Sequence, residues 1–335
     1  MSRDSRLTNA LWVATLALIA AYAITNFARG PFGSSSGSAA MAPPQLTLWV
    51  PGPERGAEGM TVAREAAAEL ELEGRRVAVK GLPGGSSRGI SGFLSRRSGR
   101  APGLLVLTSS TLADIAHDRH ENLVPGVAAE ALLSGELLRR SHSVGVLAAE
   151  PLQIGVPASS PIRGPTGLLA MLRSEPGRLL VALSQDSYSR VALAGLLERS
   201  GTRGSIRFEV HESPAVAVDA AETGAANLVL APRGAVLPDL RRERLRPLAW
   251  PVAGAAPRSW VALVAPPRIG PHLLGRLRRT VARVTVSPAW RRSQGRAGRE
   301  IPRVGRLSRL GVPPSHALQR AEREETVAEI VESRG

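Results

Sequence analysis

The sequence predicts an α/β fold in which short strands alternate with amphipathic helices. Three observations predict it: apolar runs of strand length recur along the chain, the segments between several of them show helical periodicity, and the loops after the runs are rich in Gly and Ser. Strands and helices that alternate at this spacing form βαβ units, which assemble into mostly parallel sheets. The 335 residues are enough for two domains at about 100–200 residues each.

The chain begins with a segment that is long enough to cross a membrane. Residues 7–28 carry no charge, whereas Arg3 and Arg6 precede them and Arg29 follows. A helix of this length rises about 33 Å, which exceeds the ~30 Å hydrocarbon core of a bilayer. The basic residues before the segment favour an N-terminus in the cytoplasm. We therefore expect residues 1–29 to be a signal anchor or a cleaved signal peptide, and the globular part to lie outside the cytoplasm.

A linker and two kinds of element follow. Residues 30–44 are rich in Gly, Ser and Pro and predict a flexible tether. Eight apolar runs are candidate strands: 45–51, 75–81, 103–109, 151–157, 179–184, 207–211, 227–232 and 259–266. Helical periodicity marks five segments: 62–70, 166–174, 189–199, 273–284 and 317–332. The polar face of the fourth helix carries Arg276, Arg279 and Arg283, which we interpret as a solvated surface.

The positive charge of the chain is confined to one late stretch. The formal net charge is +15, and 42 of the 43 basic residues are Arg, the exception being Lys80. Residues 241–310 hold 17 Arg against Glu243 and Glu300, a net of +15, so the 26 basic and 26 acidic residues elsewhere cancel. Aromatic residues make up only 3% of the chain, which leaves few platforms for stacked bases. We therefore expect no nucleic-acid partner and attribute the Arg content to compositional drift.

The chain contains no cysteine. This excludes disulfides, thiolate metal sites, cysteine nucleophiles and a lipid-modified N-terminal cysteine. The apolar N-terminal segment is then the visible means of holding the protein at a membrane.

Loops rich in Gly and hydroxyl residues follow four of the candidate strands. They read PGPERGAEGM after the first strand, LPGGSSRG after the second, SST after the third and QDSYS after the fifth. Ligands of open α/β sheets bind beyond the carboxyl ends of the strands, and unpaired N–H groups at helix N-termini attract anions. The pattern indicates either a site for a small anion, such as a carboxylate or phosphate, or ordinary strand-to-helix turns, which use the same residues.

One of these loops also matches the nucleophile motif of serine hydrolases. Gly85–Gly89 fits G-x-S-x-G, with Ser87 as the nucleophile and His211 or His272 as an available base. The residues from Gly81 to Gly84 separate the strand from the motif, so the turn is too long for the strained elbow of that fold. A hydrolase is therefore the weakest of the alternatives.

Two further motifs lack a necessary part. His117 and His120 are spaced to bind a metal on one helix face, but no third ligand is evident. The glycines at 84–89 have the spacing of a phosphate-binding loop without its following Lys. We therefore expect no enzymatic activity, no cofactor and no metal site.

Taken in order, these segments resemble the extracytoplasmic solute-binding proteins of tripartite tricarboxylate transporters, the TctC or Bug receptors. QLTLWVPGPERGAEGMTVAREAAAEL resembles the first strand, loop and helix of that family, RRVAVKGLPGGSSRGISGFLSRR its second strand and loop, and GLLVLTSSTLA its third strand and turn. PLQIGVPASSPIRGPTGLLAMLRSEPGRLLVALSQDSYS resembles the beginning of its second domain, and SWVALVAPPRIGPHLLGRLRRTVARVTVSPAWR the late return to the first. The resemblance covers residues 45–332 and rests on the ordered series of motifs.

The resemblance implies a type II periplasmic-binding-protein fold, with two lobes, a hinged cleft and two crossing strands as the hinge. It places lobe 1 at residues 45–150 and 251–335 and lobe 2 at residues 151–250. It implies a monomer that captures a small carboxylate in the cleft, delivers it to membrane permease subunits and is held by its N-terminal helix. The alternative is an envelope-anchored sensor or scaffold on the same fold, which binds acidic partners or lipids through the basic stretch.

The resemblance also implies a ligand site drawn from both lobes. In lobe 1 the matching positions are Gly56, Ala57, Glu58, Gly59, Gly85, Ser86, Ser87 and Ser109. In lobe 2 they are Ser184, Asp186, Ser187 and Ser189. The acidic residues of these loops, Glu54, Glu58 and Asp186, would repel an anion unless Arg55, Arg88 or Arg190 offsets them.

Overall fold

The structure is a computed structural model, and it describes residues 46–301 apart from 52–57, 73, 75, 84, 96–102, 121–134, 185–186, 203–205 and 253–255. The chain divides into two units, Met1–Pro43 and Pro44–Gly335, and every described residue belongs to the second. The predicted signal anchor, the linker and the helix at 317–332 lie outside the described residues. Among the helices that the structure describes, none has the length and apolarity that a bilayer span requires.

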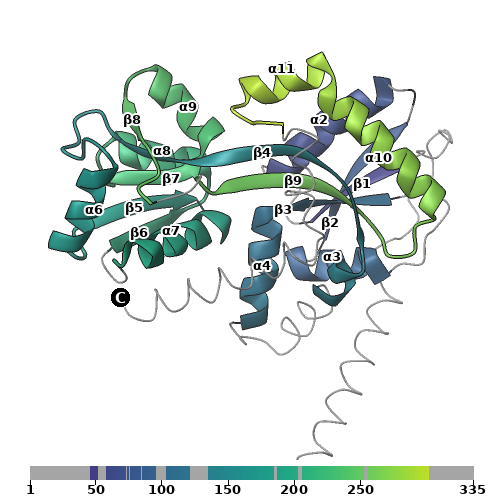
Figure 1. The fold of residues 1–335 in the computed structure, drawn as a ribbon, viewed down its shortest axis with the longest axis horizontal. Helices are drawn as coiled ribbons and strands as arrows, with labels where there is room; N and C mark the ends of the chain where they lie inside the picture. Colours follow the sequence, from purple (N-terminus) through teal and green to yellow (C-terminus); the bar gives the residue numbers. More distant parts are fainter. Residues whose placement is uncertain are drawn as a thin grey trace, which may run out of the picture. The chain divides into compact units, whose positions relative to one another are not determined.

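The described strands form one sheet in the order β2-β1-β3-β9-β4-β7-β5-β6, and β8 pairs with β4 outside this path (Figure 1). Parallel pairs make up each end of the sheet, because β1 pairs with β2 and β3, and β5 pairs with β6 and β7. The strands of one end are β1 (Leu46–Pro51), β2 (Val77–Leu82) and β3 (Gly103–Thr108). Those of the other are β5 (Leu179–Ser184), β6 (Ile206–His211), β7 (Leu228–Pro232) and β8 (Leu245–Leu248).

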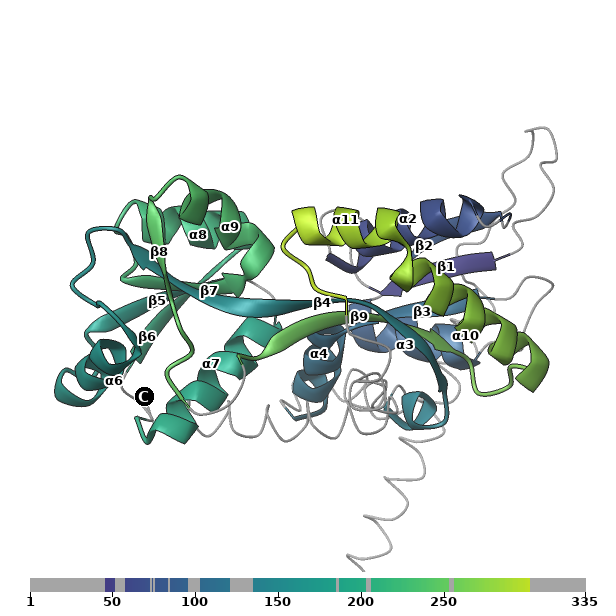
Figure 2. The ribbon, with the colours of Figure 1, turned by 45° about the horizontal axis from the view of Figure 1, so that its top comes forward.

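Two long strands, β4 (His142–Pro157) and β9 (Arg258–Ala265), join the two ends (Figures 1 and 2). β9 pairs with β3 on one side and with β4 on the other. β4 pairs with β9 as far as Pro151, and from Leu152 onward it pairs with β7 and β8. The sheet thus defines two lobes, lobe 1 around β1, β2 and β3 and lobe 2 around β5 to β8. The predicted boundaries of the lobes, residues 45–150 and 251–335 for lobe 1 and residues 151–250 for lobe 2, stay a prediction.

Helices cover the sheet in both lobes (Figure 2). Those of lobe 1 are α2 (Glu58–Leu72), α3 (Gly85–Ser95), α4 (Ser109–His120), α10 (Pro271–Val286) and α11 (Pro288–Arg296). Those of lobe 2 are α6 (Pro165–Ser174), α7 (Ser187–Ser200), α8 (Pro214–Glu222) and α9 (Arg233–Arg241). The connections from β1 to α2, from β2 to α3 and from β5 to α7 are the βα units that the loops predict.

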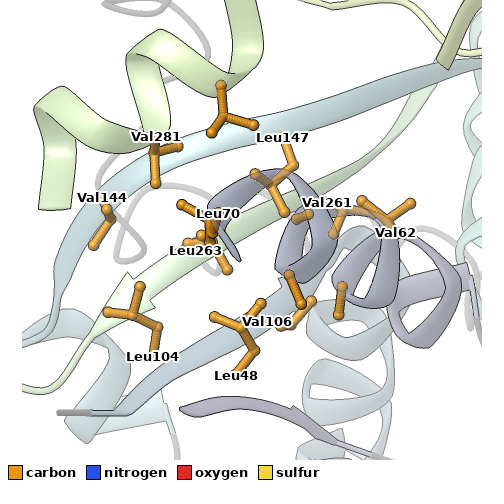
Figure 3. Packing of buried hydrophobic residues seen from close by; sticks show 14 of the residues in the cluster. Leu48, Val62, Leu70, Leu104, Val106, Val144, Leu147, Val261, Leu263 and Val281 are labelled. Carbon is orange, nitrogen blue, oxygen red and sulfur yellow. The ribbon is translucent and has the colours of Figure 1, made fainter. Parts of the chain in front are cut away.

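Each lobe has its own hydrophobic core. In lobe 1 the apolar stripe of α2 packs with β1 and β3, and Val62 and Leu70 of α2 belong to the same buried cluster as Leu48 and Val106 (Figure 3). The predicted stripe of α10 closes the same core, and its Val281 is 3% exposed. In lobe 2 the inward residues of β5 and β7 pack against α6 and α7. Separate cores allow the lobes to keep their structures while the strands between them bend.

The expectation of a mostly parallel sheet is wrong at the junction of the lobes. Four of the eight strand pairings among the described residues are antiparallel, and each of these four involves β4 or β9. These two strands pass between the lobes and do not belong to βαβ units. The first part of β4 was not predicted, because the small residues of VGVLAAE continue into the next apolar run without a turn signal.

Four short elements were also not predicted, namely β8, α8, α9 and α11. Two of the helices carry a recognisable start signal, a Ser followed by a Pro. Ser213 accepts a hydrogen bond from the Val216 backbone N–H, and Ser287 accepts one from the Trp290 N–H. Ser is a favoured N-cap residue and Pro is favoured at the first helical position, so both starts were readable from the sequence.

Candidate functional site: the junction between the lobes

The strand registers direct the loops of both lobes toward one stretch of β4. Thr108, the last residue of β3, lies opposite Val261 of β9, which lies opposite Ala148 of β4. Pro232, the last residue of β7, lies opposite Leu152 of β4. β3 and β7 therefore approach residues 148–152 from opposite directions and end there. Because parallel neighbours end at the same edge of a sheet, the loops after β1, β2 and β5 belong to the edges that face this junction.

Gly59 is a predicted site residue that packing requires to be glycine. It lies in the first turn of α2 and is buried. A Cβ atom at this position would lie 3.1 Å from Thr108 Cγ2 and 3.4 Å from Val50 Cγ1. The missing side chain therefore brings the start of α2 against the carboxyl ends of β1 and β3, where its backbone N–H groups face the junction side of the sheet.

The first turn of α3 contains three of the predicted residues, Gly85, Ser86 and Ser87. Their side chains lie outside the described atoms. Ser87 is the third residue of the helix, and β2 ends at Leu82. In a hydrolase elbow the nucleophile occupies the turn between strand and helix, which is not the position of Ser87. The available base His211 ends β6 in lobe 2, whereas α3 belongs to lobe 1.

Ser109 connects α4 to the junction strand β9. It is the first residue of α4 and is 4% exposed, and its Oγ accepts a hydrogen bond of 3.3 Å from the Trp260 backbone N–H. The residue before it, Thr108, accepts a hydrogen bond of 3.0 Å from the Thr111 N–H through Oγ1 and so caps the helix. Sequence reasoning missed this cap, although a Thr just before SSTLA is an ordinary N-cap signal.

In lobe 2 the predicted serines lie at the end of β5 and the start of α7. Ser184 is the last residue of β5 and is 2% exposed, and Ser189 in the first turn of α7 is fully buried. Ser187 begins the same helix. Helices α4 and α7, which begin at the predicted residues Ser109 and Ser187, contact each other across the two lobes.

The remaining predicted residues are not placed with their side chains. Gly56, Ala57 and Asp186 lie outside the described residues. Glu58 begins α2, and nothing is described of its side chain or that of Ser187. The assignment of all these residues to a ligand site stays a prediction.

Sequence reasoning missed Glu150, a carboxylate at the junction that is 3% exposed. The backbone N–H of Gly234 in α9 donates a hydrogen bond to its Oε1, and Arg299 Nε lies 3.7 Å from its Oε2. Burial raises the pKa of Glu150 above its usual range, against the lowering effects of the Gly234 N–H and of Arg299. The available signal was that Glu150 is the only charged residue between Val144 and Val156.

A basic surface lies on α10 and α11. The two helices contain no acidic residue. Five of their exposed arginines form no ion pair with any residue that the structure describes: Arg276, Arg279, Arg291, Arg292 and Arg296. The predicted solvated face of α10 is thus exposed.

The structure describes no cluster of side chains that could hold a metal ion, within the residues that it covers. His117 and His120 both fall in the last turns of α4, where the side chains lie outside the described atoms.

No model of a known protein family matches the sequence, and a search of curated proteins finds no match. Solved structures match over most of the chain. MatC from Rhodopseudomonas palustris, solved with bound malate, has 17% identity and a TM-score of 0.58, and the match covers 86% of this chain and 98% of that one. A second R. palustris protein, solved with adipate, has 19% identity and a TM-score of 0.61 over 85% and 97% of the two chains.

A TctC solute binding protein from Polaromonas has 14% identity and a TM-score of 0.62 over 87% of this chain and 98% of its own. At such identities the matches establish the fold. The chain therefore has the mixed α/β, two-lobe fold of periplasmic solute-binding proteins. The resemblance to TctC and Bug receptors is confirmed at the level of the fold.

Proposed function

We propose that the protein is an extracytoplasmic solute-binding protein, and not an enzyme, that holds a small carboxylate between its lobes and presents it to a tripartite membrane transporter. The observation that carries the proposal is the junction, where β3 and β7 end at the same stretch of β4 and α4 contacts α7. Two proteins with this fold were solved with malate and with adipate, which are both dicarboxylates. The apolar segment at residues 7–28 would hold the protein at the membrane, or direct its export if cleaved.

The chemistry of the junction suits an anion. The helices α2, α3, α4 and α7 begin after strands that end there, and their N-termini carry the positive end of the helix dipole. The first turns of α3 and α7 each contain an Arg as the fourth residue, Arg88 and Arg190. Guanidinium groups form charge-assisted hydrogen bonds with carboxylates. We propose that one such Arg from each lobe offsets the acidic residues of the loops and engages the ligand.

A thermal-shift screen of the full chain against mono-, di- and tricarboxylates tests this function. A ligand at 100 times its dissociation constant stabilises the folded state by about 2.7 kcal/mol. We expect dicarboxylates to raise the melting temperature. Cooperative unfolding that no carboxylate shifts would contradict the proposed function.

The role of Arg190 is tested by substitution in the same assay. We expect Arg190→Ala to weaken dicarboxylate binding by about tenfold or more, because hydrogen bonds to charged groups contribute about 1.5–3 kcal/mol. Arg173→Ala is the matched control, since Arg173 is exposed in the last turn of α6 and should leave affinity unchanged. Equal affinities of the two variants for the dicarboxylate would show that Arg190 does not take part in binding. Ser87→Ala should weaken binding at most, whereas a hydrolase would lose its activity.

The basic surface favours a second candidate, a sensor or scaffold on the same fold that binds acidic partners or lipids. The five exposed arginines of α10 and α11 that lack ion pairs with the described residues would act through long-range charge. Such binding falls steeply as salt screens the charges, whereas binding between the lobes falls much less. Sedimentation with anionic vesicles at low and high salt, compared between the wild type and an Arg276→Glu, Arg291→Glu variant, separates the two functions.

A further inference from the structure

Glu150 makes contacts in both lobes from a position inside the junction. It lies on β4 one residue before Pro151, where the pairing of the strand with β9 ends. Its Oε1 accepts a hydrogen bond from Gly234 at the start of α9, which belongs to lobe 2. Its Oε2 faces Arg299, which follows α11 of lobe 1. The side chain is therefore a link between elements that a movement of the lobes would separate.

The other charged groups around Glu150 do not neutralise it fully. Arg299 is shared, because its Nη1 lies 3.5 Å from Oε2 of Glu65 on α2 and its Nε lies 3.7 Å from the Glu150 carboxylate. Arg258 of β9 is engaged with Glu300, at 3.0 Å. On α9 the nearest charged residue in sequence is Arg233, next to Gly234. From β9 the residue opposite Glu150 is the neutral Ser259.

Two glycines make the contact around this carboxylate possible. A Cβ atom on Gly234 would lie 2.4 Å from the Ala297 carbonyl oxygen and 2.8 Å from Glu150 Oε1. A Cβ atom on Gly298 would lie 3.0 Å from Gly234 Cα, and the φ of Gly298 is +77°. The start of α9 thus rests directly on the turn at residues 297–298, and this contact buries Glu150.

The burial of Glu150 ties its ionisation to the contact between the lobes. An ionised carboxylate that is removed from water is destabilised unless its partners replace the lost hydration. Arg299 replaces it only in part, because this Arg is shared with Glu65 and lies beyond hydrogen-bond distance of Glu150. Moving α9 away from the 297–298 turn would expose Glu150 to water and restore that hydration. The carboxyl group therefore binds its proton more readily in the arrangement shown than in a separated one, and the raised pKa agrees with this direction.

We propose that Glu150 is a proton-dependent latch between the lobes. Its protonated form favours the arrangement in which α9 rests on the 297–298 turn, and its ionised form favours separation, because protonation always shifts an equilibrium toward the state with the greater proton affinity. The latch is a property of the junction and does not require a bound solute. Its failure would leave the proposed binding function untouched, and the reverse also holds.

Distances between spin labels measured by pulsed electron paramagnetic resonance, without solute, test the latch. Because the chain has no cysteine, Ala68→Cys on α2 and Ala170→Cys on α6 give one labelled site on each lobe, and both positions are exposed. We expect the distance distribution of the doubly labelled chain to shift as the pH rises from about 4.5 toward 8. A distribution that is identical across this range would overturn the proposal.

Two substitutions in the labelled chain set the latch in opposite directions. Glu150→Gln keeps an oxygen acceptor for the Gly234 N–H but does not ionise, so its distribution should stay in the low-pH form at every pH. Gly234→Ala places a methyl group against the Ala297 carbonyl, so its distribution should stay in the high-pH form. If Glu150→Gln fails to fold, as judged by circular dichroism, the distance distribution of Gly234→Ala still tests the latch.

Each variant has a matched control. Glu300→Gln removes an exposed acid that also pairs with an Arg at the junction, and it should keep the pH dependence of the wild type. Gly167→Ala adds a methyl group near the start of α6 where no atom lies within 4 Å, and it should change nothing. A Glu150→Gln chain that follows the pH dependence of the wild type would refute the latch, as would a Gly234→Ala chain that retains the low-pH form.

Discussion

The absence of a Cβ atom at Gly59, Gly234 and Gly298 allows neighbouring elements of this protein to come into contact. Gly59 lets α2 approach β1 and β3, and the other two glycines let α9 approach the turn after α11. Several other glycines of the described chain face open space, so the residue type alone does not reveal which glycines are required by packing. Gly92 in α3, for example, has no atom within 4 Å of the position of a Cβ.

The packing at Gly59 predicts the outcome of adding one methyl group. We expect Gly59→Ala to lower the free energy of unfolding by about 1–3 kcal/mol, because overpacking against Thr108 and Val50 forces backbone shifts. Gly92→Ala, within a helix and in open space, should leave stability unchanged or raise it by up to about 1 kcal/mol. Urea unfolding of the two variants checks this prediction. Equal midpoints would contradict it, because they would show that the start of α2 accommodates the added methyl group without a loss of stability.

At the scale of elements, helix starts explain why some helices were predicted and others were not. Long helices with an apolar stripe, such as α2 and α10, are visible from periodicity. Short helices such as α8 and α11 depend on their caps, because nine residues give too few turns for a clear pattern. Their Ser-Pro starts fix the first turn locally, before tertiary contacts form.

The cap of α11 predicts the effect of a hydroxyl deletion. Ser287 accepts a hydrogen bond of 3.1 Å from the Trp290 N–H, and Trp290 is fully buried. Ser287→Ala should therefore lower the free energy of unfolding by about 1 kcal/mol. Ser174→Ala, which removes an exposed hydroxyl at the end of α6, should stay within about 0.5 kcal/mol of the wild type. The denaturation midpoints measure both, and indistinguishable losses would mean that packing of Trp290 alone holds the helix start.

For the whole molecule, the decisive feature is that both lobes share β4 and β9. The chain crosses between the lobes along strands that belong to one continuous sheet, while each lobe keeps a core of its own. Small changes in the two shared strands can therefore move the lobes as bodies. In the latch that we propose, the charge of Glu150 is buried at this crossing and not in either core.

The burial of Glu150 also predicts how the stability of the whole chain changes with pH. Its pKa is raised in the folded state above the usual value of 4.5, so between that value and the raised pKa the folded state binds more protons than the unfolded state. The contribution of Glu150 to stability is present at low pH and is lost as the pH rises through this window. The free energy of unfolding of the wild type, relative to Glu150→Gln, should fall across the window. A constant or rising difference, measured by urea titration at several pH values, would contradict this.

The helix starts around the candidate site could be predicted from the sequence because they follow local rules, whereas the assignment of their residues to a ligand site stays a prediction. Gly-rich and Ser-rich loops after apolar runs predicted the starts of α3, α4 and α7, and these starts lie where the loops indicate. Glu150, Gly234 and Arg299 could not be read in this way. They are far apart in sequence and ordinary in type, and only the crossing of β4 and β9 makes them neighbours.

The sequence by itself determined the alternation of strands and helices, the apolar stripes that build two cores, the location of the positive charge and the resemblance to a family of binding proteins. These depend on periodicity and on turn chemistry, which act within a few residues. The tertiary structure alone decided the antiparallel crossing strands, the convergence of both lobes on residues 148–152 of β4 and the burial of Glu150. The physical reason is that strand partners and desolvation depend on contacts between residues distant in sequence, for which no local pattern exists.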